Sequence, residues 1–148
     1  MSRPDPKEKV LRSFELIDHT ADVGLRAQAD SLAELLTAAA EGMFHILVEA
    51  DAVEEREELL VELEADDAGE LVHTWLRELL FHFDVENILL RRFDVQEATP
   101  TRLRAVCHGE TLDPERHEGQ VEIKAVTYHQ FHVHQTPDGW TTEVLFDI

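Results

Sequence analysis

The sequence predicts an α+β fold: a single domain with a largely antiparallel β-sheet and two amphipathic helices packed on it. Two segments repeat apolar residues with the helical period, and several others alternate with the period of a strand. These segments follow the order strand, strand, helix, strand, helix, and then strands only. The 148 residues suit one domain. We expect residues 1–12, which are polar and mixed in charge, to be a flexible N-terminal lead-in and residues 13–148 to be the domain.

The first third of the chain predicts two strands and a helix. Residues 12–17 suit a short strand, and residues 23–29 alternate as a second one. Ser31 begins a helix, because Glu34 three residues later completes a capping box. The apolar stripe of this helix consists of Leu32, Leu35, Leu36, Ala39, Met43, Ile46 and Leu47.

The middle third predicts a strand and a second helix. Residues 57–65 alternate, with acidic side chains on one face. Asp67 and Glu70 form another capping box. The strongest helical period of the chain follows, in Leu71, Val72, Trp75, Leu76, Leu79, Leu80 and Phe83. We place the polar residues of this helix and its end on the solvent side: His73, His82, Asp84 and Glu86.

The last third predicts strands over residues 88–96 and 102–109, a polar loop over 112–119, and a hairpin. The hairpin joins residues 121–136 to 140–146 around Asp138-Gly139, a two-residue turn signal. With that turn, Thr136 faces Thr141 and Gln130 faces Asp147.

Composition limits the function. The net charge is −19, and two of the three lysines lie at positions 7 and 9, which argues against a cationic face that could neutralise nucleic-acid phosphates. We therefore expect no direct, stable nucleic-acid binding, and a preference for a basic partner. No apolar run reaches the roughly 18 residues of a membrane span. The single cysteine excludes an internal disulfide and is typical of a reducing, cytoplasmic location.

Two carboxylates in the segment Asp18-His19-Thr20-Ala21-Asp22 and one in the C-terminal Phe146-Asp147-Ile148 suggest a cation site. Asp147 lies next to the terminal carboxylate, so two anions are close together. Carboxylate oxygens favour a hard cation, most consistently Ca²⁺, with Mg²⁺ or Mn²⁺ as alternatives. His19 suits a hydrogen-bond donor that orients a carboxylate. The alternative for the first segment is a turn whose Asp and Thr side chains bind their own backbone.

Lys124 and the histidines near it allow two interpretations each. Lys124 is the only lysine beyond position 9, in a chain with ten arginines. It is either an exposed strand lysine or a reachable positive charge for an anion. His132 and His134 share one strand face, which is either solvated or part of a transition-metal site.

Together, the segment at residues 18–24, the segment Lys124-Ala125-Val126-Thr127-Tyr128 and the penultimate Asp147 resemble the archease family. The resemblance covers about residues 14–148. It implies a non-catalytic, metal-binding accessory protein that activates the RtcB-type tRNA-splicing RNA ligase. It also implies that Asp22 and Asp147 bind the metal, that Ile148 contributes a terminal or main-chain oxygen, and that Lys124 takes part in activation.

Two other functions stay open at this point. One is a small metal-dependent hydrolase that uses His19, Asp22 and the strand histidines, although no nucleophile is evident. The other is a chaperone-like modulator of nucleic-acid-modifying enzymes, a role that the resemblance also implies.

Overall fold

The structure, a computed structural model, describes residues 12–18 and 22–148 and confirms the predicted α+β class. Of the predicted N-terminal lead-in only Arg12 is among the described residues, as the first residue of a strand. The elements in chain order are β1 (Arg12–Asp18), β2 (Asp22–Ala29), α1 (Leu32–Leu47), the short 3-10 helix η2 (Ala50–Ala52), β3 (Glu57–Glu64), α2 (Ala68–Glu86), β4 (Ile88–Thr99), β5 (Arg102–Thr111), β6 (Ala125–Val126), β7 (His132–Thr136) and β8 (Gly139–Asp147).

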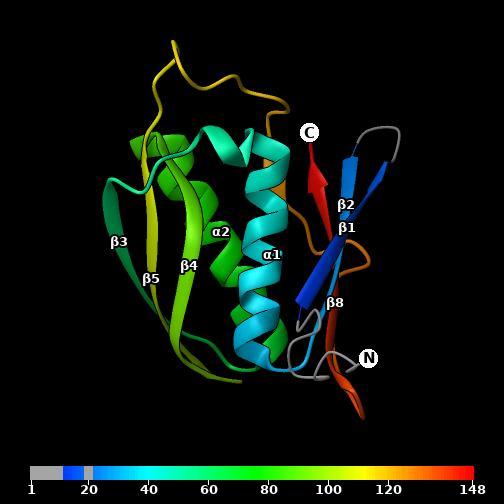
Figure 1. Cartoon of the computed structure of the whole chain (residues 1–148). Coiled ribbons are helices and arrows are strands. Elements are labelled where there is room, and N and C mark those ends of the chain that lie inside the picture. The colour runs from blue at the N-terminus through cyan, green and yellow to red at the C-terminus, as the bar shows by residue number, and fades with distance from the viewer. Residues whose placement is uncertain (1–11, 19–21) are drawn as a thin grey trace, which may run out of the picture.

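The described strands form two antiparallel sheets (Figure 1). A five-stranded sheet has the order β1-β2-β8-β6, and β7 also pairs with β8, beyond β6 along the same edge. A three-stranded sheet has the order β3-β5-β4. The sequence predicts antiparallel strands, and the structure adds their division between two sheets.

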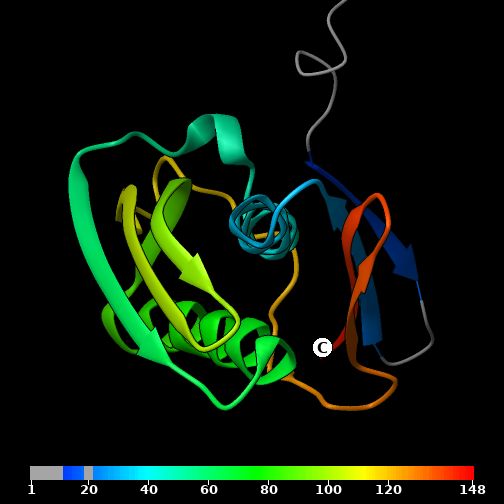
Figure 2. The ribbon, with the colours of Figure 1, turned by 90° about the horizontal axis from the view of Figure 1, so that it is seen from below.

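Helix α1 lies between the two sheets, and α2 packs beside it (Figure 2). α1 contacts β1, β2 and β8 of one sheet and β4 of the other, whereas α2 contacts the three-stranded sheet, β6 and β7. Trp75 of α2 donates from Nε1 to the carbonyl of Leu36 in α1, at 2.9 Å. Gly42 lets α1 approach the five-stranded sheet closely, since a Cβ there would lie 2.5 Å from a methyl carbon of Leu25. One hydrophobic core therefore joins both sheets and both helices.

Both predicted helix starts are confirmed by their caps. Ser31 Oγ accepts a hydrogen bond from the main-chain N–H of Glu34 at 3.1 Å. Asp67 Oδ1 accepts the equivalent bond from Glu70 at 2.8 Å. A side-chain acceptor three residues before a free N–H satisfies one of the unpaired donors of the first turn, which is why both helices begin there.

Strands β4 and β5 are longer than their patterns predict. They pair as far as Thr99 and Arg102, across a tight connection, and β5 runs on to Thr111. The register shifts between Leu90 and Arg92 and again between Val95 and Glu97. Such irregularities interrupt the alternation of a strand, which explains why the predicted end came too early.

The prediction of one continuous strand over residues 121–136 is wrong. It divides into β6 and β7, and the residues between them form a turn in which Gln130 has a φ of 55°. Thr127 holds this turn against β8, because its main-chain N–H and its hydroxyl both donate to the carbonyl of Leu145, at 3.0 and 2.9 Å.

The predicted hairpin turn is also wrong. Thr136 pairs with Gly139, so the two loop residues are Pro137 and Asp138. Proline fixes a φ that suits the second position of a β-turn, and this preference outweighs the Asp-Gly signal. The pairing of β7 consequently shifts by two residues. The interruption between β6 and β7 shifts the pairing of β6 by three more, so Asp147 pairs with Ala125 instead of Gln130.

Two further observations concern the single cysteine and the helices. Cys107 is a buried strand residue, and burial raises the pKa of its thiol to about 12. Among the described helices, none has the length and apolarity needed to cross a membrane.

Candidate functional site

The last residues of β8 bring together chain segments that lie far apart in the sequence. Asp22, the first residue of β2, is directly opposite Asp147, the last residue of β8. On the other side of β8, Ala125 of β6 is opposite Asp147. The main-chain N–H of Lys124 donates to the carbonyl of Asp147 at 2.7 Å. The C-terminus therefore lies in the middle of the sheet, beside the end where β1 and β2 meet (Figure 1).

The Asp22–Asp147 pair has the donor chemistry that a hard cation needs. Directly opposed residues of antiparallel strands point to the same face, with Cβ atoms roughly 4.5–5.5 Å apart. Asp147 is exposed and Asp22 is partly buried. Two carboxylates at this spacing repel each other, and a divalent cation with oxygen ligands relieves that repulsion. Ile148 follows Asp147 and lies in the same part of the sheet.

The donor set remains small within the described residues. They contain no group of three or more His, Cys, Asp or Glu side chains that could hold a metal ion. Two carboxylates supply few ligands, so a cation held by Asp22 and Asp147 would keep several waters, as Mg²⁺ and many Ca²⁺ ions do. It does not offer the sulfur or imidazole ligands that Zn²⁺ prefers.

The structure assigns different positions to the other predicted site residues. Ile148 is partly buried and packs against the main core, which holds the end of the chain in place. Asp18 ends β1, where it pairs with Val23, the neighbour of Asp22. The prediction for His19 falls on a residue outside the described ranges.

Lys124 borders Asp147 through its main chain. It is exposed, and its side chain makes no ion pair with any residue that the structure describes. Its main chain, in contrast, is held by the bond to Asp147. The backbone is thus fixed while the ammonium group can reach a ligand or a partner.

His73 corrects one prediction. It was expected on the solvent side of α2, yet it is fully buried. It lies three and seven residues before Leu76 and Leu80, which places it at the edge of the apolar stripe. This spacing could have indicated that His73 is buried. The prediction placed it on the solvent side because histidine is polar.

The buried His73 ring supports Tyr128, a residue that the prediction did not single out. The two rings stack in parallel, with centroids 3.6 Å apart and 7° between their planes. His73 Nε2 lies 3.1 Å from the carbonyl of Thr127, and burial lowers the pKa of the imidazole, so the neutral ring donates this bond. His73 therefore holds the segment that follows Lys124.

His132 and His134 share a face of β7, as predicted. Their rings stack with centroids 4.7 Å apart and 17° between the planes. His132 Nε2 is 4.0 Å from a carboxylate oxygen of Glu143 on β8, which pairs with it. His134 is exposed and His132 is partly buried, as on a solvated strand face. Among the residues that the structure describes, the two histidines belong to no group of three or more His, Cys, Asp or Glu that could hold a metal ion.

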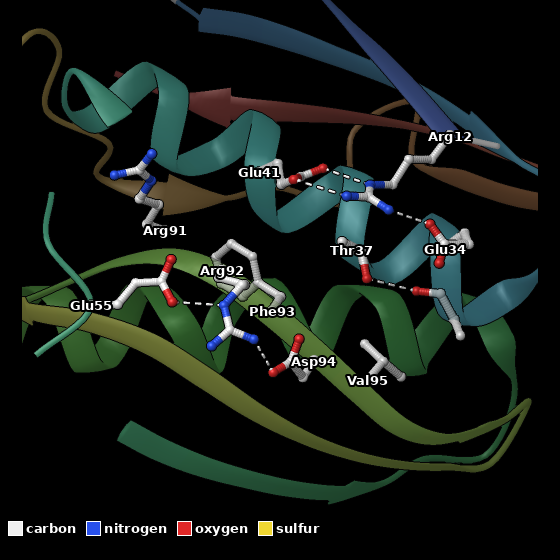
Figure 3. A pocket seen from close by; sticks show the side chains of 11 residues that line it. Arg12, Glu34, Thr37, Glu41, Glu55, Arg91, Arg92, Phe93, Asp94 and Val95 are labelled. Carbon is white, nitrogen blue, oxygen red and sulfur yellow. Dashed lines mark hydrogen bonds and ion pairs between the residues drawn. The ribbon is translucent and has the colours of Figure 1, made fainter. Parts of the chain in front are cut away.

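A charged cleft of about 520 Å³ lies elsewhere, between α1 and β4 near the start of β1 (Figure 3). Arg12 bridges Glu34 and Glu41 of α1, and Arg92 of β4 bonds Glu55. The hydrogen bond to Glu41 is the main reason why the pKa of Arg12 is raised. These charged side chains already pair with one another, so we interpret the ion pairs that line the cleft as structural. The cleft includes none of the predicted site residues.

Comparison with known proteins agrees with the resemblance seen in the sequence. A model of the Archease protein family (MTH1598/TM1083) matches residues 14–148. The chain is 39% identical over 142 residues to the protein archease of Pyrococcus abyssi, covering 93% of this chain and 100% of that one. It is 38% identical over 138 residues to the protein archease of Methanopyrus kandleri, covering 91% and 99% of the two chains.

A solved structure shares the fold. The solution structure of Methanobacterium thermoautotrophicum protein 1598 superposes with a TM-score of 0.80 at 35% identity, covering 91% of this chain and 98% of that one. Sequence and fold agree over nearly the whole chain, so this protein belongs to the archease family.

Proposed function

We propose that this protein is a non-catalytic, metal-binding activator of an RtcB-type tRNA-splicing RNA ligase, which promotes guanylylation and multiple turnover of the ligase. Membership of the archease family supports the association with an RNA ligase. The observation that carries the proposal is the strand pairing that sets Asp22 opposite Asp147, with the main chain of Lys124 bonded to the same residue.

In this proposal, Asp22, Asp147 and the terminal carboxylate of Ile148 hold one divalent cation. Ca²⁺ suits these oxygen donors best, and Mg²⁺ or Mn²⁺ are alternatives. When bound, the cation supplies a positive centre that attracts anionic oxygens. The strand pairing on both sides of Asp147 sets the positions of the two aspartates before any ligand arrives.

Lys124 acts beside the cation in this account. Its ammonium group is exposed and has no carboxylate partner among the described residues, so it can contact a carboxylate or a guanylate phosphate where the two proteins meet. Net charge adds a longer-range effect, because −19 attracts a basic, nucleotide-binding cleft.

The experiment uses purified ligase from the same organism and measures its guanylylation with and without this protein. We expect clear acceleration by the intact chain and a reduced rate with Lys124→Ala, while calorimetry shows that cation binding is retained. Asp138→Asn, at the tip of the β7–β8 hairpin, is the matched control. If the intact chain leaves guanylylation and turnover unchanged, the proposed activity is wrong.

The same preparation separates the two alternatives. A metal-dependent hydrolase acts without a ligase, whereas a chaperone-like modulator binds other nucleic-acid-modifying enzymes, such as methyltransferases. Purification of the protein from its own cells with an affinity tag therefore distinguishes them: we expect the RNA ligase to be recovered, and recovery of methyltransferases alone would favour the modulator.

A further inference from the structure

The exposed side of α2 carries large apolar side chains that the core does not use. Phe81 is 52% exposed and Val85 is 62% exposed. With the exposed Arg77 they are spaced by four residues, so the three lie along one face of the helix. We call these three residues and Tyr128 the α2 face.

Tyr128 belongs to this face because it lies beside Arg77. The guanidinium carbon of Arg77 is 6.0 Å from the centroid of the Tyr128 ring. The Tyr128 hydroxyl donates to Glu70 Oε2 at 3.1 Å, which ties the ring to the first turn of α2. Tyr128 nevertheless remains 53% exposed.

The orientation of Tyr128 is fixed before any partner binds. His73 covers one ring face, and Phe131 meets the ring edge-on with centroids 6.2 Å apart. Contacts with His73, Phe131 and Arg77 therefore hold the ring, although about half of Tyr128 stays exposed. Large aromatic side chains that are already ordered lose little entropy on binding, and such residues dominate the energy of many interfaces.

The α2 face is continuous with the candidate site. Tyr128 follows Lys124 by four residues, and the segment between them is attached to β8 through Thr127 and Leu145. In Figure 2 this segment runs between α2 and the C-terminal strand. A partner that reaches Lys124 and Asp147 thus has Tyr128, and then the rest of the α2 face, beside it.

The charges around the α2 face indicate the kind of partner. Glu78 and Asp84 flank Phe81 at three residues on either side, and Glu70 lies at Tyr128. Glu122 lies near Asp84, and burial together with this second carboxylate raises the pKa of Asp84. Arg77 is the only positive charge among these residues, so the surroundings of the apolar centre are acidic.

We propose that the α2 face is the docking surface for a protein partner that presents an apolar patch surrounded by lysine and arginine side chains. The inference rests on the proposed function and gives it a second contact: the partner is the RNA ligase, and the α2 face supplies affinity while the site at Asp147 supplies activation. An apolar, aromatic centre within a charged rim is the usual anatomy of a protein interface.

The experiment titrates the ligase with this protein and records both the half-saturating concentration and the maximal rate of guanylylation. We expect the double variant Phe81→Ser/Val85→Ser, and separately Tyr128→Ala, to raise the half-saturating concentration about tenfold or more without changing the maximal rate. Leu60→Ser is the matched control, since Leu60 is 49% exposed on β3, outside the α2 face. Rising salt and the charge reversal Asp84→Lys should weaken binding in the same way.

Each result is decisive. If the intact protein activates the ligase and the double variant has the same half-saturating concentration, the α2 face is not the docking surface while the proposed function stands. If the intact protein neither binds nor activates the ligase, both fail. If sedimentation shows a dimer of the intact chain that the double variant dissociates, the α2 face binds a second copy, and the inference is again wrong.

Discussion

Asp22 and Asp147 show what the sequence could and could not reveal about single residues. Their chemistry suggested oxygen ligation of a cation, but 124 intervening residues separate them, and only the register of β2 and β8 brings them together. Register depends on contacts along the whole strand pair, so a pattern within one segment cannot supply it. His73 was missed for a related reason: whether a histidine at a stripe edge is buried depends on what packs there.

A first prediction concerns the cation. Calorimetry should detect Ca²⁺ binding to the intact protein, and Asp22→Ala should abolish it, because one carboxylate fewer leaves too little negative charge at the site. Asp30→Ala, just beyond the other end of β2, is the control. Tight Zn²⁺ binding that survives Asp22→Ala but disappears in His132→Ala would instead indicate a histidine site.

A second prediction concerns the buried carboxylate of Glu110. Burial alone would raise its pKa, but hydrogen bonds from Arg116, the main-chain N–H of Glu54 and His117 outweigh this and lower the pKa from 4.5 to about 2. A lowered folded-state pKa stabilises the protein above pH 4.5, and this stability is lost as the pH falls towards 2.

Urea unfolding at several pH values tests this effect with Glu110→Gln. The variant should be less stable than the intact protein at neutral pH, and the difference should shrink as the pH falls below 4.5. Glu115→Gln, an exposed neighbour, should show no such trend. A stability difference that is independent of pH would contradict the assigned cause.

At the scale of elements, sequence patterns predicted correctly those features that depend on neighbouring residues. Ser31 and Asp67 cap the helices that they were predicted to begin, since a cap involves only three neighbouring residues. The interruption between β6 and β7 could not be predicted, because Thr127 is held by Leu145 on another strand. The division into two sheets also depends on contacts between distant strands, so the alternation of apolar and polar residues within each strand could not predict it.

A third prediction follows for the helix caps. Asp67→Ala should lower the free energy of unfolding by about 1 kcal/mol, the typical cost of losing a side-chain cap. Asp67→Ser should restore most of it, because serine can accept the same bond from Glu70. Equal stability of all three proteins in urea unfolding would show that this cap does not stabilise α2.

At the scale of the whole molecule, net charge and strand order limit what the protein can bind. The acidic composition disfavours nucleic-acid binding, and the strand order places Asp22 and Asp147 beside the main chain of Lys124. The first statement is an expectation from composition alone. The second required the strand order, in which β8 lies between β2 and β6.

A fourth prediction is that the protein does not retain tRNA in a gel-shift assay at moderate salt. With a net charge of −19, the protein as a whole repels the phosphates of tRNA, which opposes any contact with them. The ligase from the same organism serves as the positive control. Micromolar binding that weakens steeply as salt rises would reveal a cationic face that the composition argues against.

The central claim is that Asp22 and Asp147, which pair between β2 and β8, are needed to activate the ligase. Asp147→Asn tests it most directly, because it removes one charge and keeps the main-chain acceptor for Lys124, which deletion of the last two residues would remove. The measurement is multiple-turnover ligation and guanylylation of the ligase, beside the circular dichroism spectrum of each variant. The account predicts a folded Asp147→Asn protein that binds the ligase but no longer accelerates it. A folded Asp147→Asn protein that activates as well as the intact chain would contradict the account.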